Sequence, residues 1–302
     1  MSAIVSAGSC LWFAFVFASL GSGSLMADER VTTTEYQGAD SELASFPNSA
    51  STLPQGKWSL EWSTVSYTDG SKVSVPMASS DVLIRYGLFD PLELRIYTQG
   101  VTAQWGSNRT VGFSPLTFDL KARLLETTDE SPWLPGVAFE TAIQTQLMGS
   151  AAFDAGTEPT FTLNVDQPLG DFLFQYNVGT MRFMSPCNPN QLDWNLTYSW
   201  SLEREVTEDL TFFVDGFYGS SILPKVTTMS KVTPGVCTGT GSAANSYGKN
   251  GRLFGENMVG GGLFWHATPD LGFYMNVAGG TNVDSPGVMS YLGFVLSPTL
   301  IH

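Results

Sequence analysis

The stretch Leu192-Asp-Trp-Asn-Leu-Thr-Tyr-Ser-Trp-Ser-Leu202 decides the fold class, because a large apolar residue occupies every second position along it. Successive side chains of a β-strand point to opposite faces, so this stretch has one face of leucines and aromatics and one of small polar groups. At about 3.3 Å per residue and a tilt of roughly 40°, it spans the apolar band of about 25 Å of an outer-membrane barrel. Strands of soluble sandwiches are usually about five or six residues long. The stretch therefore predicts a membrane-spanning strand.

The same alternation recurs along the rest of the chain, and the connections between the alternating segments are short and long in turn. Short turns at one end and long loops at the other are typical of an up-and-down bacterial barrel with its short turns in the periplasm. We therefore predict an all-β fold, a transmembrane up-and-down antiparallel β-barrel of about 12 strands in the outer membrane of a Gram-negative-type envelope. The expected strands are 56–68, 80–88, 92–104, 114–126, 136–148, 158–167, 171–183, 191–204, 210–221, 255–267, 271–280 and 287–297.

Three regions precede or interrupt the strands. An apolar run at 11–20 ends in small residues up to Ala27, which predicts a cleaved signal peptide over 1–27. Residues 28–55 are polar and lack a strand pattern, so they form either a periplasmic tail or a plug inside the barrel. The barrel itself is expected over 56–302, with its longest extracellular loop at about 223–253.

Composition and motifs exclude several classes of function. The chain has 14 Lys and Arg against 28 Asp and Glu, a net charge of −14, which argues against a nucleic-acid partner. No His or Cys pair stands at metal-ligand spacing, and neither a Gly-x-Ser-x-Gly motif nor a phosphate-binding glycine loop is present. We expect no catalytic residues, no metal and no cofactor, and hence not an enzyme. The expected partners are membrane lipid and small solutes, with the oligomeric state left open.

Two cysteines remain after the predicted cleavage, Cys187 and Cys237, and both stand in loops rich in Pro, Gly and Asn. Paired loop cysteines in an exported protein usually form a disulfide, which is our prediction. Two free thiols are the alternative.

The alternation also assigns side chains to the lumen or to lipid. A charged group facing lipid at mid-bilayer costs roughly 2–4 kcal/mol, so charges in the strands are expected to face inward. They form either a network of ion pairs that fills a narrow barrel or a polar constriction that screens solutes, and the two are compatible. Outward tryptophans are expected in interfacial belts at headgroup level, namely Trp58, Trp62, Trp194 and Trp200. The expected lumen wall consists of Arg85, Glu93, Arg95, Asp119, Lys121, Arg123 and Glu140.

Three segments carry a family resemblance: Ser80-Asp-Val-Leu-Ile-Arg-Tyr-Gly-Leu-Phe-Asp-Pro-Leu-Glu-Leu-Arg95, Phe118-Asp-Leu-Lys-Ala-Arg123 and Pro135-Gly-Val-Ala-Phe139. Over residues 56–145 the chain resembles the outer-membrane transporter family named for the meta-pathway of phenol degradation. The resemblance implies a closed β-barrel and the uptake of small, often aromatic or hydrophobic, compounds.

Together these features predict an outer-membrane barrel that lets small solutes pass passively, gated by loop 223–253 or by the 28–55 segment. The first alternative is a barrel with a filled lumen and a structural or surface-interaction role. The second is a secreted soluble β-sandwich.

Overall fold

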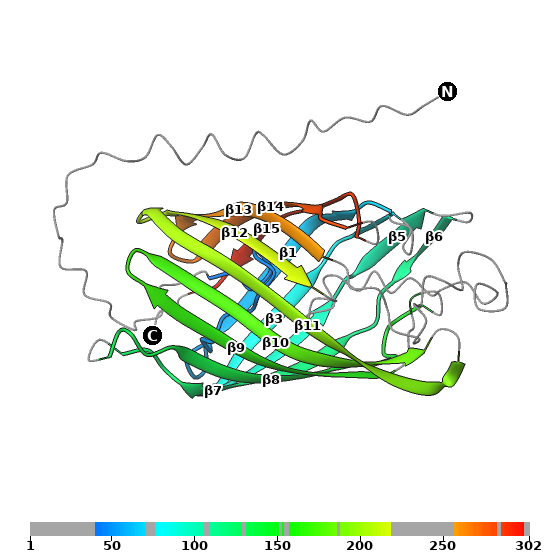
Figure 1. Cartoon of the computed structure of the whole chain (residues 1–302), viewed down its shortest axis with the longest axis horizontal. Helices are drawn as coiled ribbons and strands as arrows, with labels where there is room; N and C mark the ends of the chain where they lie inside the picture. Colours follow the sequence, from blue (N-terminus) through cyan, green and yellow to red (C-terminus); the bar gives the residue numbers. More distant parts are fainter. Residues whose placement is uncertain are drawn as a thin grey trace, which may run out of the picture. The chain divides into compact units, whose positions relative to one another are not determined.

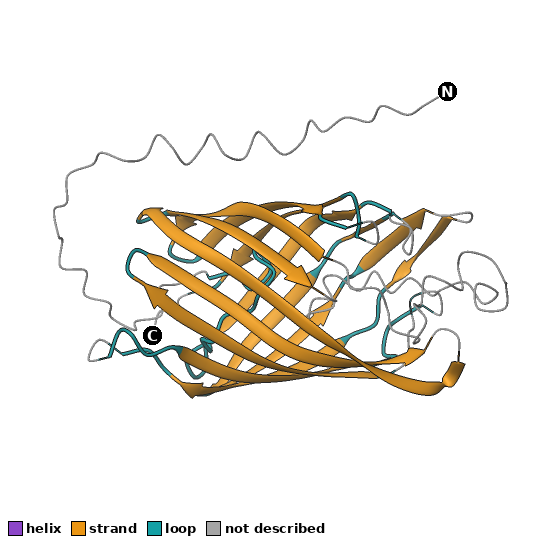
Figure 2. Cartoon of the chain, in the orientation of Figure 1, coloured by secondary structure: helices purple, strands orange, loops and turns teal. Residues whose placement is uncertain are grey.

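The computed structural model describes residues 40–70, 76–105, 109–128, 131–150, 153, 157–185, 188–218, 257–282 and 285–298. Within these ranges the chain is all-β (Figures 1 and 2), and no helix is long and apolar enough to cross a membrane. The predicted signal peptide, the loop 223–253 and both loop cysteines, Cys187 and Cys237, lie outside the described residues.

The described residues form one antiparallel sheet of fifteen strands that closes on itself. The strands are β1 (Trp58–Thr68), β2 (Met77–Ser79), β3 (Val82–Phe89), β4 (Leu92–Thr98), β5 (Val101–Trp105), β6 (Arg109–Phe113), β7 (Thr117–Leu125), β8 (Gly136–Gln144), β9 (Glu158–Leu169), β10 (Phe172–Ser185), β11 (Asn188–Thr207), β12 (Leu210–Tyr218), β13 (Asn257–Thr268), β14 (Leu271–Gly280) and β15 (Val288–Leu296).

Twelve of these strands make the barrel, each paired with its neighbours in chain order. The last strand, β15, pairs antiparallel with β1 from Leu60↔Leu296 to Thr68↔Met289 and closes the ring. Closure leaves no unpaired edge along this seam, as a β-structure inside lipid requires. The predicted up-and-down barrel is confirmed.

The other three strands, β2, β5 and β6, extend the second, third and fourth strands of the barrel. Both sets of strands start from β1. The extension pairs in the order β1–β2–β5–β6, and the barrel strands pair in the order β1–β3–β4–β7. The predicted strand 92–104 is therefore two strands, β4 and β5. The break is at Gly100, whose φ of 56° favours glycine and where a side chain would collide with the Ser80 carbonyl.

The stretch Leu192–Leu202 lies in β11 and shows the predicted two faces. Trp194 and Leu196 are 53% and 62% exposed, whereas Ser199 and Ser201 are at most 1% exposed. A closed barrel with aromatic and aliphatic side chains over its outer face is stable only in lipid, so the protein is placed in the bacterial outer membrane. The four predicted belt tryptophans are exposed or half-buried, and their height in the membrane stays a prediction.

Gly262 on β13 provides room for an inward aromatic ring. A methyl group there would meet the Met275 carbonyl oxygen and lie 2.6 Å from the Phe213 ring. We expect Gly262→Ala to lower the free energy of unfolding by about 1–3 kcal/mol, the usual effect of overpacking. The matched control is Gly279→Ala, whose methyl group would have no neighbour closer than 3.9 Å among the described residues. Urea unfolding in lipid vesicles measures both variants, and equal losses would contradict this role of Gly262.

Candidate functional site

Six of the seven predicted lumen residues meet on the inner face of four adjacent strands, β3, β4, β7 and β8. They stand in two cross-strand rows, because Arg85 pairs with Arg95 and Arg95 with Asp119, while Glu93 pairs with Lys121 and Lys121 with Glu140. All six are at most 2% exposed. We call this group the charged wall: Arg85, Glu93, Arg95, Asp119, Lys121 and Glu140.

Ion pairs connect the charged wall. Arg85 donates to both oxygens of Glu93, from Nε at 2.8 Å and from Nη2 at 3.1 Å. Arg95 Nη1 lies 2.8 Å from a Glu140 oxygen and 3.2 Å from Asp119 Oδ2. Charges buried this deeply are stable only when they are paired and hydrogen-bonded, and each arginine has at least one carboxylate within 3 Å.

Arg123, the seventh predicted residue, does not join this wall. Its side chain is 22% exposed, and Nη1 lies 2.8 Å from Oε1 of Glu126, the residue that follows β7. The strand register shifts between Arg123 and Leu125, so the regular alternation ends where Arg123 stands. Arg123 forms a local ion pair beside the turn.

The charged wall has a further partner, Glu42, which the sequence analysis did not single out and which belongs to the segment expected to be either a periplasmic tail or a plug. Residues 41–53, here called the inner segment, run inside the barrel, and Glu42 of this segment contacts three cations. Lys121 Nζ lies 2.8 Å from Glu42 Oε1, Arg85 Nη2 lies 3.4 Å from the same oxygen, and Arg95 Nη2 lies 3.6 Å from Oε2. Burial alone would raise the pKa of Glu42, but the three cations hold that pKa well below its usual range.

Among the described strands none pairs with the inner segment, so its backbone N–H groups must find acceptors elsewhere. Side chains of the barrel supply them. The donor–acceptor pairs are Glu42 N and Leu43 N with Glu61 at 2.9 Å, Phe46 N with Asp215 at 3.0 Å, Asn48 N with Asn177 at 2.5 Å, Ala50 N with Asp166 at 2.8 Å, and Leu53 N with Glu93 at 2.7 Å. The acceptors come from β1, β4, β9, β10 and β12, so the segment is held around much of the ring.

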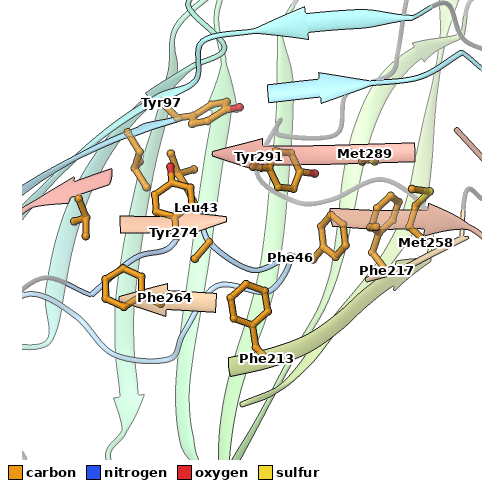
Figure 3. Close-up of a cluster of buried hydrophobic side chains, with 14 residues drawn as sticks. Leu43, Phe46, Tyr97, Phe213, Phe217, Met258, Phe264, Tyr274, Met289 and Tyr291 are labelled. Carbon is orange, nitrogen blue, oxygen red and sulfur yellow. The ribbon is translucent and has the colours of Figure 1, made fainter. Parts of the chain in front are cut away.

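Apolar side chains of the inner segment face a second wall, nearly opposite the first by strand order. This aromatic wall consists of Phe213, Phe217, Phe264, Tyr274 and Tyr291 on β12 to β15. Figure 3 shows Leu43 and Phe46 among these rings. The Phe46 ring lies edge-on to Phe217, with centroids 4.8 Å apart, and edge-on to Tyr291 at 6.0 Å.

The lumen therefore has a charged wall and an aromatic wall, with the inner segment between them. Leu43, Phe46 and Asn48 are each at most 2% exposed, like the walls they contact. At this level protein groups fill the lumen, and water does not reach the charges. The charged wall binds the Glu42 carboxylate, and the aromatic wall packs against the apolar side chains of Leu43 and Phe46.

Comparison with known proteins supports the fold. No family model and no curated protein matches the chain. An outer-membrane channel from Pseudomonas putida F1 is similar in structure, with a TM-score of 0.55, 11% identity, and coverage of 83% of this chain and 99% of that one. A NanC porin has a TM-score of 0.47 at 11% identity, covering 81% of this chain and 100% of its own.

The phospholipase A of the Escherichia coli outer membrane gives a TM-score of 0.39 at 10% identity, covering 81% of this chain and 94% of its own. Of these three structures the Pseudomonas putida channel has a TM-score above 0.5, and at 11% identity its likeness concerns the fold alone. The fold and its apolar outer surface define the class as an outer-membrane β-barrel protein.

Proposed function

We propose that the protein is an outer-membrane channel for small solutes and that the inner segment closes it. The observation that carries the proposal is the position of residues 41–53 between the charged and aromatic walls, where they fill the lumen. The segment is held by hydrogen bonds to side chains and not by a strand ladder. It can therefore leave the lumen without breaking the pairing that closes the barrel, and water can replace each lost contact.

The two walls also suggest what passes. Small aromatic or hydrophobic compounds would contact the aromatic wall once Leu43 and Phe46 move away from it. The local resemblance to the phenol meta-pathway transporters implies the same solutes. The proposed role is that of a channel and not of an enzyme, since passage of solutes through a lumen needs no nucleophile.

A filled barrel with a structural or surface-interaction role is the second candidate. It is favoured by the number of backbone N–H groups of the inner segment that barrel side chains accept. In that case the segment is a permanent part of the core. The two candidates differ in one property, which is whether the segment must move for solutes to pass.

A disulfide that pins the inner segment tests this difference. The Cβ of Ala50 lies 3.6 Å from the position that a Cβ on Gly136 of β8 would take, within the usual disulfide range of about 3.5–4.5 Å. We expect Ala50→Cys/Gly136→Cys, with Cys187 and Cys237 replaced by serine, to admit small aromatic solutes into proteoliposomes only when reduced. The oxidised form should swell no faster than liposomes without protein.

The single variant Ala50→Cys in the same background is the control, and oxidant should leave its swelling rate unchanged. Equal swelling of the oxidised and reduced double variants would show that solutes do not need the segment to move. No swelling in either form would favour the filled barrel.

A further inference from the structure

The position of the Glu42 carboxylate has the chemistry of a site for an organic anion. Three cations on the barrel wall surround it, and all three are at most 1% exposed. The carboxylate that they bind belongs to the inner segment and not to the wall. When the segment leaves the lumen, the wall keeps the cations and loses this carboxylate.

Lys121 depends most on the inner segment. Among the described residues, each of the three hydrogen bonds of Nζ goes to the segment: to Glu42 Oε1 at 2.8 Å, to the Ser49 carbonyl at 2.9 Å and to the Ser51 carbonyl at 3.3 Å. Arg85 and Arg95 differ, because Glu93 and Glu140 on the wall stay with them. When the segment leaves, Lys121 loses all three of these acceptors, and a solute carboxylate would offer it a charge-assisted hydrogen bond, which is stronger than a bond to a neutral acceptor such as water.

Arg95 provides a second, independent indication. Within the part of the chain that the structure describes, its buried Nε and Nη2 atoms have no hydrogen-bond partner, and Nη2 stands 3.6 Å from Glu42 Oε2. This distance is too long for a good charge-assisted hydrogen bond, which is about 2.7–2.9 Å. Glu42 is fixed by the main chain of the segment, whereas a free carboxylate can move closer to Arg95. The Glu42 carboxylate therefore leaves part of the hydrogen-bonding capacity of Arg95 unused.

The residue next to Glu42 indicates where the remaining part of an organic anion would pack. Leu43 follows Glu42 directly and lies in the cluster with the aromatic wall. The inner segment thus places a carboxylate on one wall and an apolar side chain on the other within two residues. We propose that the lumen binds small amphipathic carboxylates, with the carboxylate on Lys121, Arg85 and Arg95 and the apolar part on the aromatic wall, in the place of Glu42 and Leu43.

This inference rests on the proposed function, because a solute reaches the position in the native chain only if the segment moves aside. The binding itself can be tested without transport. The glutamate side chain beyond its Cα is a propanoate group, so 3-phenylpropanoate presents the same carboxylate with a ring in place of the main chain. Its neutral amide, 3-phenylpropanamide, has nearly the same shape and is the matched probe.

The experiment is rescue of Glu42→Ala made together with Leu43→Ala, so that both the carboxylate and the apolar group of the segment leave space for the probe, and every Glu42 variant in this rescue test carries Leu43→Ala. We expect this variant to unfold at a lower temperature than the native chain, and 3-phenylpropanoate to restore most of the loss. Propanoate should act more weakly, since it lacks the ring. The amide should bind about tenfold more weakly than the acid, because hydrogen bonds to charged groups are the stronger ones.

Two further variants keep the test sharp. Glu42→Gln fills the same space with a neutral group and should respond little to 3-phenylpropanoate. Glu42→Ala combined with Lys121→Met should lose the preference for the acid over the amide. Equal effects of acid and amide on Glu42→Ala, or equal effects of the acid on Glu42→Ala and the native chain, would overturn the anion site. That outcome would leave the channel proposal standing, because the disulfide experiment tests it separately. If instead the acid rescues Glu42→Ala while the oxidised and reduced disulfide variants swell equally, the anion site stands and closure by the inner segment is overturned.

Discussion

Replacing Arg95 with methionine is expected to lower the free energy of unfolding by about 3–5 kcal/mol, since breaking a buried ion pair leaves an uncompensated charge. The Arg95 guanidinium is fully buried, 2.8 Å from Glu140 and 3.2 Å from Asp119. Methionine retains much of the length of the side chain and removes its charge. Both carboxylates then remain in a part of the lumen that water does not reach.

Arg123→Met is the matched control for this variant. Arg123 pairs with Glu126 at the same short distance of 2.8 Å, but both side chains are partly exposed. Exposed ion pairs contribute about 0–1 kcal/mol, so the control should lose at most about that amount. Urea unfolding in lipid vesicles, followed by tryptophan fluorescence, measures both variants. Similar losses for the two would show that the charged wall does not stabilise the barrel.

The sequence was sufficient to predict the barrel because strand alternation is a local property. Each of the twelve barrel strands lies within a few residues of its expected position, and the alternation in β11 separates Trp194 from Ser199 as expected. The extension formed by β2, β5 and β6 was not predicted. A strand such as Met77–Ser79 has too few residues to show a period of two, and the break at Gly100 depends on one backbone angle.

The charged wall was also accessible from alternation, since charges avoid lipid and must therefore face inward. Alternation did not predict that Arg123 stands apart from the wall, because a register shift at the end of a strand is a feature of the pairing. Whether a charge lies near other charges depends on its height in the barrel, and the sequence pattern gives no height.

The sequence left residues 28–55 open between a periplasmic tail and a plug, because a segment that makes no ladder has no period that would place it. Its contacts join distant parts of the chain, such as Phe46 and Asp215, which are 169 residues apart. One signal was present nonetheless. Asp166 and Asp215 face inward on strands that place no Lys or Arg directly opposite them. Inward carboxylates with no cation directly opposite indicate donors from elsewhere in the chain, and here Ala50 N–H donates to Asp166 and Phe46 N–H donates to Asp215.

Deleting residues 41–53 is expected to open the lumen. A barrel of about eight strands is filled by its own side chains, whereas one of sixteen or more encloses an aqueous channel. With twelve strands, this barrel has space that the inner segment occupies. Removal of the segment leaves the strand pairing unchanged and lets water solvate Glu61, Asp166 and Asp215. A heat-dependent gel shift should show that the shortened chain still folds.

The Glu42→Ala variant is the control for this deletion, because it changes the charge balance of the lumen and keeps the segment. Its conductance should stay close to that of the native chain. The deletion should be permanently open, whereas the native chain should be closed for most of the record.

Single-channel conductance in planar bilayers is the most direct measurement of the central claim that the inner segment closes the channel. We expect the mean current through the shortened chain to exceed that of the native chain by about tenfold or more at the same voltage, since a water-filled lumen replaces a packed one. Equal currents through the two folded proteins would contradict the claim.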